Sequence, residues 1–341
     1  MFQNSVIDKY RDKCICYSAT IELCNTCNWE CEHCYIPVHK NKGLSFKNVV
    51  NILEQLRKMG VFEIAFTGGE IFTRNDTLDI IMYARKLGFA VTLLTNCSLI
   101  TERDIEVLEK INVKRIETTI FSMNDEIHDR FVHCKGGLKN TIHAIEKMKL
   151  RKFEIKVKTI VMQFNFNECQ QIKEYCDKNH FEFLITPDVY IKNNGDEFPL
   201  RLRLNESQLK KYYYQYCNNG GYVYKDDNLD SFVCKSTRYS LFIDCNGNIQ
   251  PCGNYKFILG SYTDGIQKIW DESDELDIIQ NIKYRDVEKC LMCKLIPNCS
   301  VCFGIIQNYK SDLKKYVPLD TDCAIANIRK RIGKEGENEK I

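Results

Sequence analysis

Residues 20–35, Thr-Ile-Glu-Leu-Cys-Asn-Thr-Cys-Asn-Trp-Glu-Cys-Glu-His-Cys-Tyr, join a short apolar segment to a run rich in cysteine. Residues 20–23 have the composition of a β-strand. Cys27, Cys31 and Cys34 follow it with the spacing C-x3-C-x2-C. Three thiolates on one loop can hold one metal centre, with one ligand fewer than a closed zinc or four-iron site uses. The stretch therefore predicts either an iron site with an open position or a structural zinc loop.

Strand-like and amphipathic helical segments alternate from this stretch onward. Strands are expected at residues 20–23, 62–66, 90–94, 115–121, 155–162 and 181–185, and helices at 45–59, 75–86, 101–110, 138–150 and 167–178. This alternation is typical of parallel βαβ units, and six units are fewer than the eight of a closed barrel. Ligands of such folds bind beyond the carboxyl ends of the strands, which is where the cysteines lie.

Composition limits the classes of function. The chain has 341 residues, 44% of them hydrophobic and 28% charged, which suggests about two domains. Its 48 basic and 46 acidic side chains give a net charge of +2, so binding to nucleic acid is not expected. No apolar run reaches ~18 residues and the N-terminus lacks a signal-peptide core, so we expect no membrane association and a cytoplasmic protein. In that reducing compartment, 19 cysteines indicate metal ligands or catalytic thiols.

The cysteine spacing, its flank at residues 23–28 and the ending His33-Cys34-Tyr35 resemble radical SAM enzymes. The resemblance implies an α/β fold built as a partial (β/α)6 barrel. It also implies that Cys27, Cys31 and Cys34 hold a [4Fe-4S] cluster whose unique iron is chelated by S-adenosylmethionine. Reduction of that complex yields a 5′-deoxyadenosyl radical, and the protein supplies positioning.

A glycine pair and a carboxylate, Gly68-Gly69-Glu70, follow the second predicted strand. Two glycines allow close approach of the backbone to a ligand, and a carboxylate can accept a hydrogen bond from an ammonium group. In the resembled family this motif binds the amino group of S-adenosylmethionine. Ile71 stands where proline is frequent in that family.

Further cofactor contacts are expected at the ends of the next strands. Short hydroxyl and amide side chains there suit ribose and carboxylate groups. By resemblance, the cofactor-binding residues also include Thr95, Asn96, Thr119, Ser122, Arg130 and His33. Among these, Arg130 would reach a carboxylate, and His33 would pack near the adenine. The segment 126–130 is interpreted as a loop, in which His128 and Asp129 cap or orient the chain.

Seven cysteines recur in the C-terminal third, at positions 234, 252, 290, 293, 299, 302 and 323. The pattern is C-x12-G-x4-C, then C-x2-C-x5-C-x2-C, then a last cysteine. Seven ligands exceed one tetrahedral site, so two centres are implied. Spacing alone fits two zinc sites or two iron–sulfur clusters equally well.

This arrangement resembles a SPASM domain, the auxiliary-cluster extension of many radical SAM enzymes, with an opening hairpin at residues 241–253. By analogy, two auxiliary [4Fe-4S] clusters are held by Cys234, Cys252 and Cys302 and by Cys290, Cys293, Cys299 and Cys323. The interval from Cys299 to Cys302 is one residue shorter than usual. Cys245 would complete the first set, donate hydrogen to a substrate radical, or be an ordinary surface thiol.

The expected domains are a small N-terminal extension at 1–17, the barrel at 18–200, a linker with a bridging helix at 201–230, the SPASM domain at 231–326 and a tail at 327–341. Resemblance implies an enzyme that abstracts hydrogen from a peptide or protein substrate and forms a crosslink or thioether or epimerises a residue. The alternatives are formylglycine formation as in anaerobic sulfatase maturation, modification of a small molecule such as a haem precursor, and a non-enzymatic electron carrier or zinc-stapled scaffold. Seven C-terminal cysteines weigh against a haem precursor.

Partners and a catalytic base complete the expectations. An electron donor such as ferredoxin or flavodoxin is implied. Cys27 lies too near the start for a leader-binding domain before the barrel, so a peptide would be recognised directly or delivered by a separate leader-binding protein. The base would be one of Glu126, Asp129, Asp188 and Tyr190.

Overall fold

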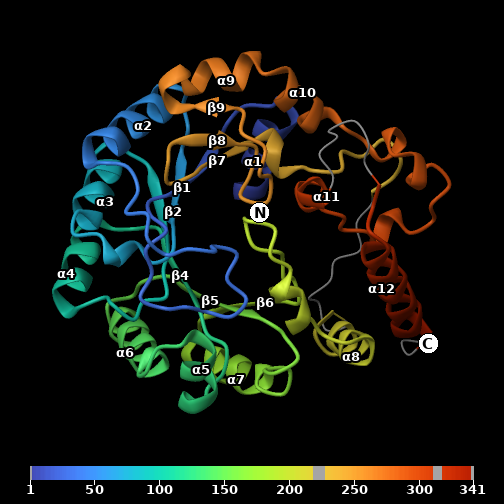
Figure 1. Cartoon of the computed structure of the whole chain (residues 1–341), viewed down its shortest axis with the longest axis horizontal. Helices are drawn as coiled ribbons and strands as arrows, with labels where there is room; N and C mark the ends of the chain where they lie inside the picture. Colours follow the sequence, from blue (N-terminus) through green and yellow to red (C-terminus); the bar gives the residue numbers. More distant parts are fainter. Residues whose placement is uncertain (1, 218–226, 310–316, 339–341) are drawn as a thin grey trace.

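A curved sheet runs through the part of the molecule that the computed structural model describes, residues 2–217, 227–309 and 317–338. Its nine strands follow the order β6-β5-β4-β3-β2-β1-β7-β8-β9 (Figure 1). Their bounds are β1 (Ser18–Glu22), β2 (Glu63–Thr67), β3 (Ala90–Leu94), β4 (Arg115–Thr119), β5 (Ile155–Ile160), β6 (Glu182–Thr186), β7 (Ser240–Ile243), β8 (Asn248–Gln250) and β9 (Gly260–Ser261). The first six strands pair in parallel, each with its neighbour in sequence. The sheet has two free edges, at β6 and β9, so the partial barrel expected from the sequence is confirmed.

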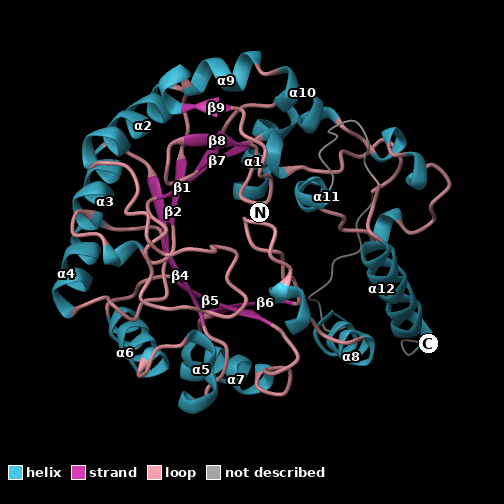
Figure 2. Ribbon diagram, in the orientation of Figure 1, coloured by secondary structure: helices cyan, strands magenta, loops and turns pink. Residues whose placement is uncertain are grey.

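The described residues form the helices α1 (Phe2–Asp12), α2 (Phe46–Lys58), α3 (Thr77–Lys86), α4 (Glu102–Ile111), α5 (Asp125–Val132), α6 (Gly137–Leu150), α7 (Cys169–Asn179), α8 (Glu206–Cys217), α9 (Ile266–Glu272), α10 (Asp274–Asn281), α11 (Phe303–Tyr309) and α12 (Asp320–Asn338). Helices α2, α3, α4, α6, α7 and α9 cover the convex side of the sheet, whereas α8, α11 and α12 lie beside its open side (Figure 2). Ser45 caps α2 by accepting a hydrogen bond from the Asn48 amide, so the predicted start of that helix is confirmed.

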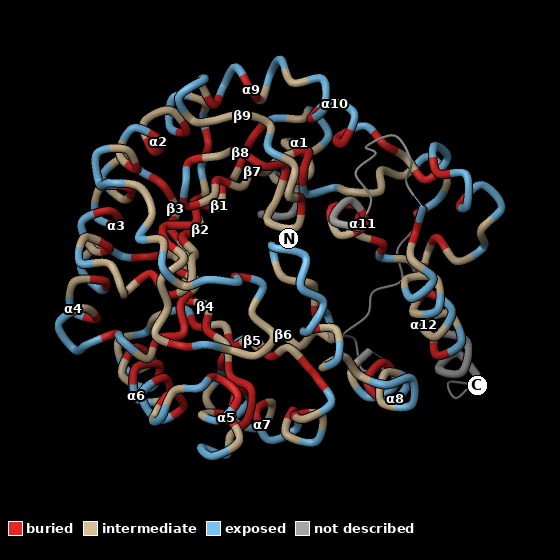
Figure 3. Tube along the Cα trace, viewed as in Figure 1, coloured by how far each residue is buried: buried red, intermediate tan, exposed pale blue. Residues whose placement is uncertain are grey.

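The main core lies between the strands and the helices. Along β2, β3 and β4 every second residue is fully buried against the helices, and the residues between them are half-buried on the concave side. Buried positions therefore follow the strands and the inner sides of the helices (Figure 3). The concave side carries charge pairs such as Glu117 with Lys158 at 2.6 Å and Lys156 with Glu182 at 2.9 Å. A polar, partly hydrated interior is left for a ligand.

The segment 126–130 is not a loop, so that interpretation was wrong. It lies within α5, because the side chain of Asn124 accepts hydrogen bonds from the amides of Glu126 and Ile127 and starts a helix there. Helices α1, α9, α10, α11 and α12 were not foreseen either. α1 covers most of the expected N-terminal extension, and α12 extends into the expected tail.

The hairpin of the cysteine-rich region continues the barrel sheet. β7 pairs in parallel with β1, with Ser18 opposite Ser240 and Ile21 opposite Ile243. β8 and β9 then add antiparallel strands. The sequence predicts the hairpin but not this pairing, because the partner strand lies more than 200 residues earlier in the chain. The consequence is that the loop after β7 lies beside the loop after β1.

Candidate radical SAM site

The three cysteines lie on the long loop that follows β1, which we call the cysteine loop (residues 24–41). The Trp29 amide donates to the sulfur of Cys27 at 3.3 Å, and the Cys34 amide donates to the carbonyl of Cys31 at 2.9 Å. The Glu30 amide reaches the carbonyl of Val132 at the end of α5. The loop is thus held at the carboxyl ends of the strands, as expected.

The three cysteines are half-buried, and their thiols influence one another electrostatically. Burial, together with the charges of Glu70 and Cys34, raises the pKa of Cys27 to about 12. Burial raises the pKa of Cys31 well above its ordinary value, and Cys34 and Cys27 add to the rise. Burial likewise raises the pKa of Cys34. These thiols are protonated without a metal, and a bound cation would stabilise their thiolates.

The glycines of Gly68-Gly69-Glu70 lie close to the cysteine loop, and their approach to the cofactor stays a prediction. A Cβ on Gly68 would lie 2.5 Å from the carbonyl oxygen of Cys24, and one on Gly69 would lie 2.4 Å from that of Thr26. The Gly69 amide donates to the Cys24 carbonyl at 2.9 Å. The close neighbour of these glycines is therefore the cysteine loop itself. The motif packs edge to edge with the segment that carries the thiols.

The carboxylate of Glu70 is fully buried and bonded within the protein. Its Oε1 accepts from the Phe72 amide at 2.9 Å, and its Oε2 accepts from the Asn96 amide at 2.7 Å. The Thr95 hydroxyl lies within 2.9 Å of both oxygens. Burial raises the pKa of Glu70, while these three donors act in the opposite direction. In the structure this carboxylate ties β2 to β3, and its role as acceptor for the amino group of S-adenosylmethionine stays a prediction.

The other predicted cofactor contacts lie at the expected strand ends, with mixed surroundings. The Asn96 side chain donates to Asn28 of the cysteine loop at 2.9 Å. Ser122 is buried and donates to Glu168 at 2.7 Å. Thr119 is half-buried at the end of β4, whereas Arg130 is exposed on α5. Of these residues, Asn96 contacts the cysteine loop, and Thr119 lies on the half-buried side of β4. A cofactor role for both stays a prediction.

His33 belongs to an aromatic wall beside the cysteine loop. Its ring stacks on Phe131 at 5.4 Å between centroids and meets Phe121 edge-on at 5.0 Å. Burial lowers the pKa of His33 to about 4, so the ring is neutral at pH 7. His128 extends the wall, 5.2 Å from Trp29. These contacts fit the packing role predicted for His33.

The seven C-terminal cysteines fall into two sets. The charges of Cys234 and Cys302 act on Cys252, whose pKa burial raises to about 12. Burial raises the pKa of Cys290 to about 12, and the charges of three further cysteines add to the rise. These are Cys293, Cys299 and Cys323. The structure thus brings Cys302 beside Cys234 and Cys252 despite the shortened interval before it. Amide groups face both sets, since Asn254 donates to the sulfur of Cys302 at 3.6 Å and the Leu295 amide donates to that of Cys293 at 3.4 Å.

Cys245 lies elsewhere, at the seam between the cysteine loop and the β7–β8 hairpin. It is 2% exposed, and Asn41 of the cysteine loop donates to its sulfur at 3.3 Å. Burial, followed by the charge of Glu22, raises its pKa to about 12. Its strongest electrostatic neighbours are Glu22, Asp244 and Cys24. Cys245 is a protonated thiol with no close link to the first auxiliary set, and its role stays a prediction.

A polar group that the sequence interpretation missed surrounds Cys245. Glu22, 6% exposed at the end of β1, accepts from the Cys245 amide at 3.3 Å and faces the Tyr35 hydroxyl at 3.5 Å. Lys256 lies over the Tyr35 ring at 5.5 Å, and burial lowers its pKa against the opposing effect of Glu22. The sequence could have indicated a site role for Glu22, because it is a charged residue at the end of the first predicted strand. Nothing in the sequence places Lys256 beside it.

A large cavity opens next to the first auxiliary set. Its volume is about 1420 Å³, and its walls come from the segment after β6, from α8 and from α12. Tyr190, Arg203, Asp188 and Asp322 line it together with Cys302. The cavity therefore connects the open side of the sheet with a cysteine of the auxiliary region.

Among the described residues, no group of three His, Cys, Asp or Glu side chains lies close enough together to hold a single metal ion. Sulfurs on one zinc lie within about 4 Å of one another. Thiolates of a four-iron cluster bind separate iron atoms. The fourth cysteine of the loop, Cys24, is fully buried and donates to the carbonyls of Thr26 and Glu70, so Cys27, Cys31 and Cys34 remain as a donor set that fits a cluster with one open iron.

Two family models match the chain. The radical SAM superfamily model covers residues 21–176, and the model of an iron–sulfur cluster-binding domain, SPASM, covers residues 234–294. With the cysteine loop at the carboxyl ends of a partial barrel, they define the class: the chain belongs to the radical SAM superfamily. Within it, the chain is one of the proteins with a C-terminal SPASM domain, and its cofactors are [4Fe-4S] clusters and S-adenosylmethionine.

Curated relatives differ in their named activities. The chain is 25% identical over 315 residues to an AdoMet-dependent heme synthase of Oleidesulfovibrio alaskensis, covering 82% of this chain and 81% of that protein. It is 26% identical over 161 residues to the sporulation killing factor maturation protein SkfB of Bacillus subtilis, covering 47% of this chain and 39% of SkfB. The first match spans both domains, and the second spans about half the chain.

Solved structures share the fold. Streptococcus suis SuiB bound to S-adenosylmethionine superposes with a TM-score of 0.70 at 14% identity, covering 89% of this chain and 76% of SuiB. The structure of anSMEcpe with AdoMet and a peptide gives 0.69 at 17% identity, covering 95% and 99%. Within the described ranges, no helix has the length and apolar character needed to cross a membrane.

Proposed function

We propose that this radical SAM/SPASM protein modifies a peptide or protein substrate by hydrogen abstraction, forming a crosslink or thioether or epimerising a residue. The observation that carries the proposal is the cavity of about 1420 Å³ that reaches Cys302. Pockets for small molecules usually span roughly 300–1,000 Å³. A space of this volume with both apolar and charged walls suits a segment of polypeptide. It would bring that segment from α8 and α12 toward the concave side of the sheet.

The residues assigned to the cofactors follow from their placement. Cys27, Cys31 and Cys34 would hold the first cluster, and the backbone of residues 68–70, with Thr95, Asn96 and Thr119, would line the S-adenosylmethionine site. The two auxiliary clusters would be held by the Cys234 set and the Cys290 set. When bound and reduced, these cofactors supply a 5′-deoxyadenosyl radical. The chain keeps water away with the wall of His33, Phe121 and Phe131.

Two of the four expected bases are better placed than the others. The carboxylate of Asp129 accepts from the amides of Gly136 and Leu138, so it holds the turn into α6. Glu126 is exposed in the first turn of α5. Asp188 and Tyr190 line the cavity, and Tyr190 is electrostatically coupled to Cys302. We therefore assign proton transfer with the substrate to Asp188 or Tyr190.

A haem precursor is the second candidate substrate. The relative whose match covers 82% of this chain is named a heme synthase, and this similarity favours a haem-precursor substrate. The number of C-terminal cysteines weighs against such a substrate. Formylglycine formation is a variant of the first candidate, since it also acts on a protein. An electron carrier or zinc scaffold leaves the radical SAM domain unexplained. An electron donor such as ferredoxin or flavodoxin, and a separate leader-binding protein, belong to the peptide proposal.

The test compares substrates under anaerobic, reducing conditions. Reconstituted protein is incubated with S-adenosylmethionine and either peptides from a digested cell extract or a haem precursor. We expect 5′-deoxyadenosine to rise with the peptides, together with peptide products that have lost hydrogen or gained deuterium from solvent. Cys31→Ala is the inactive control, and Tyr190→Phe should lower product formation. Turnover of the haem precursor with unchanged peptides would overturn the proposal.

A further inference from the structure

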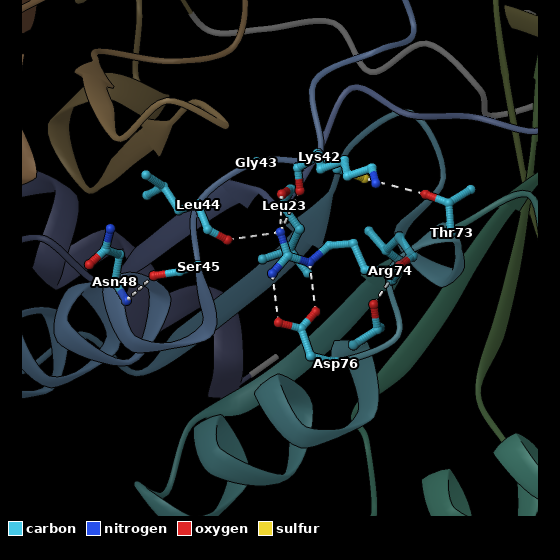
Figure 4. Close-up of polar contacts among 12 residues, drawn as sticks. Leu23, Lys42, Gly43, Leu44, Ser45, Asn48, Thr73, Arg74 and Asp76 are labelled. Carbon is cyan, nitrogen blue, oxygen red and sulfur yellow. Dashed lines mark hydrogen bonds and ion pairs between the residues drawn. The ribbon is translucent and has the colours of Figure 1, made fainter.

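Arg74 contacts both ends of the cysteine loop. Its Nη1 donates to the carbonyl of Leu23, just before the loop, at 3.0 Å (Figure 4). The same nitrogen reaches the carbonyls of Lys42 at 2.6 Å and Leu44 at 3.0 Å, just after the loop. One guanidinium therefore joins the points where the chain leaves β1 and where it turns toward α2.

Asp76 fixes the orientation of that guanidinium. Its two carboxylate oxygens accept from Nε at 2.9 Å and from Nη2 at 2.8 Å. The Arg74 side chain is 8% exposed, so little water competes for these bonds. A bidentate pair of this kind defines the plane of the guanidinium as well as its position. Nη1 is thereby directed at the three carbonyls.

Gly43 makes the junction too tight for a side chain. Its φ is +77°, and a Cβ there would lie 1.8 Å from the carbonyl oxygen of Leu23 and 3.1 Å from Nη1 of Arg74. Next to it, the carbonyl of Asn41 accepts from the amides of Asn25 at 2.8 Å and Thr26 at 3.2 Å. The backbones at the two ends of the cysteine loop are therefore in direct contact, and Arg74 bonds to both ends.

The segment that carries Arg74 also links the cysteine loop to the glycine motif. Arg74 lies four residues after Glu70 on the same segment, and Thr73 meets Thr26 of the cysteine loop with 2.7 Å between hydroxyl oxygens. The Glu70 amide donates to the Thr26 carbonyl at 2.8 Å. A shift of the loop ends would thus move the cysteines relative to residues 68–70.

We propose that Arg74 is a positioning residue for the S-adenosylmethionine site: it sets the register of the three cysteines against Gly68-Gly69-Glu70. The inference rests on the ligand assignment made under the proposed function, and it holds for either substrate candidate. S-adenosylmethionine must meet both the open iron and the glycine motif. Its affinity therefore depends on the relation between the two segments that Arg74 joins.

The test uses reconstituted holoenzyme and the variant Arg74→Lys. Lysine keeps the charge but lacks the fork that reaches Asp76 and three carbonyls. The readouts are the dissociation constant for S-adenosylmethionine, the change that it causes in the electron paramagnetic resonance spectrum of the reduced protein, and the thermal midpoint. We expect an affinity loss of about tenfold and a weakened spectral change.

Arg85 offers a matched control. It too ties backbone segments together, donating to the carbonyls of Ile111 at 2.9 Å and Phe89 at 2.5 Å, but at the amino ends of the strands. Arg85→Lys should lower the thermal midpoint while the affinity for S-adenosylmethionine stays within about twofold. Equal affinity losses in both variants would mean general destabilisation and would overturn the proposal.

A second pair of variants approaches the same junction from the other side. Gly43→Ala should reproduce the affinity loss, whereas Gly60→Ala has an equally unusual φ of +84° with open space around its Cβ and should not. This pair decides the matter if Arg74→Lys fails to fold. Wild-type affinity in Gly43→Ala would overturn the inference. Cys31→Ala must abolish the spectral change; if it does not, the ligand assignment itself fails, and the inference with it.

Discussion

Glu70 and Thr95 are bonded to each other, with the threonine hydroxyl 2.7 Å and 2.9 Å from the two carboxylate oxygens. Both residues are expected to contact the cofactor from separate strand ends, and that role stays a prediction. In the structure they join the loop after β2 to the end of β3, where the Asn96 amide completes the arrangement. The carboxylate thus acts as an internal brace of the site.

This brace predicts the behaviour of Thr95 variants. Thr95→Val removes a donor from a buried carboxylate, which should cost about 1–3 kcal/mol of unfolding free energy. Thr95→Ser keeps the hydroxyl and should retain most of the stability. Urea unfolding of the two variants measures the difference. Equal stability of the valine and serine proteins would show that the hydroxyl is not needed to satisfy Glu70.

The two cysteine sets predict a pattern of iron loss. Wild-type protein with three four-iron clusters should contain about 12 irons per chain. Cys252→Ala and Cys302→Ala should each lose about 4, and the double variant should lose no more, because both side chains serve one centre. Combining Cys302→Ala with Cys293→Ala should lose about 8. Iron and sulfide assays test this, and additive losses for Cys252 with Cys302 would contradict the grouping.

Cys245 is predicted to be a slow-reacting thiol outside the clusters. Burial and the nearby Glu22 charge raise its pKa to about 12, so thiolate is scarce at neutral pH. Cys245→Ser should leave the iron content unchanged. Mass spectrometry after brief iodoacetamide treatment of the holoenzyme should find Cys245 unmodified. A loss of about 4 irons in the serine variant would instead make Cys245 a ligand of the first auxiliary set.

His128 predicts a pH dependence of stability. The side chain is fully buried, and neither ring nitrogen has a partner within hydrogen-bond distance among the described residues, although Asp129 lies 3.6 Å from Nδ1. Burial lowers the pKa of His128 to about 4, against the opposing effect of Asp129. The unfolded chain, with a histidine pKa near ~6.5, binds more protons between these values. The stability gained by keeping this ring neutral in the folded protein is therefore fully present above about pH 6.5. It is lost as the pH falls toward 4, which lowers the free energy of unfolding by roughly 3 kcal/mol in all.

The corresponding experiment compares the pH slopes of unfolding. His128→Phe removes the proton-binding group and should flatten the fall in stability between about pH 6.5 and pH 5. An unchanged slope in His128→Phe would mean that the ring is hydrated or protonated in the native state.

The sequence predicted the six parallel strands well, because each strand and the helix after it are defined by local hydrophobic periodicity. The predicted residues 90–94 coincide with β3. The prediction for residues 126–130 failed, because a cap from Asn124 converts a short polar segment into a helix. The pairing of β7 with β1 was not predicted either, because the two strands are more than 200 residues apart in the sequence.

The sequence by itself determined the class of this protein. The class is indicated by three cysteines with their spacing, a glycine motif after the second strand and two later groups of cysteines. These are local patterns, so they can be recognised from the order of residues alone. Only the tertiary structure decided what the side chains contact. It turned Glu70 inward to Thr95, placed Cys245 against Asn41 of the cysteine loop and placed Arg74 across both ends of that loop. The physical reason is that buried polar groups must find partners, and the strand order and curvature of the sheet decide which partners are within reach.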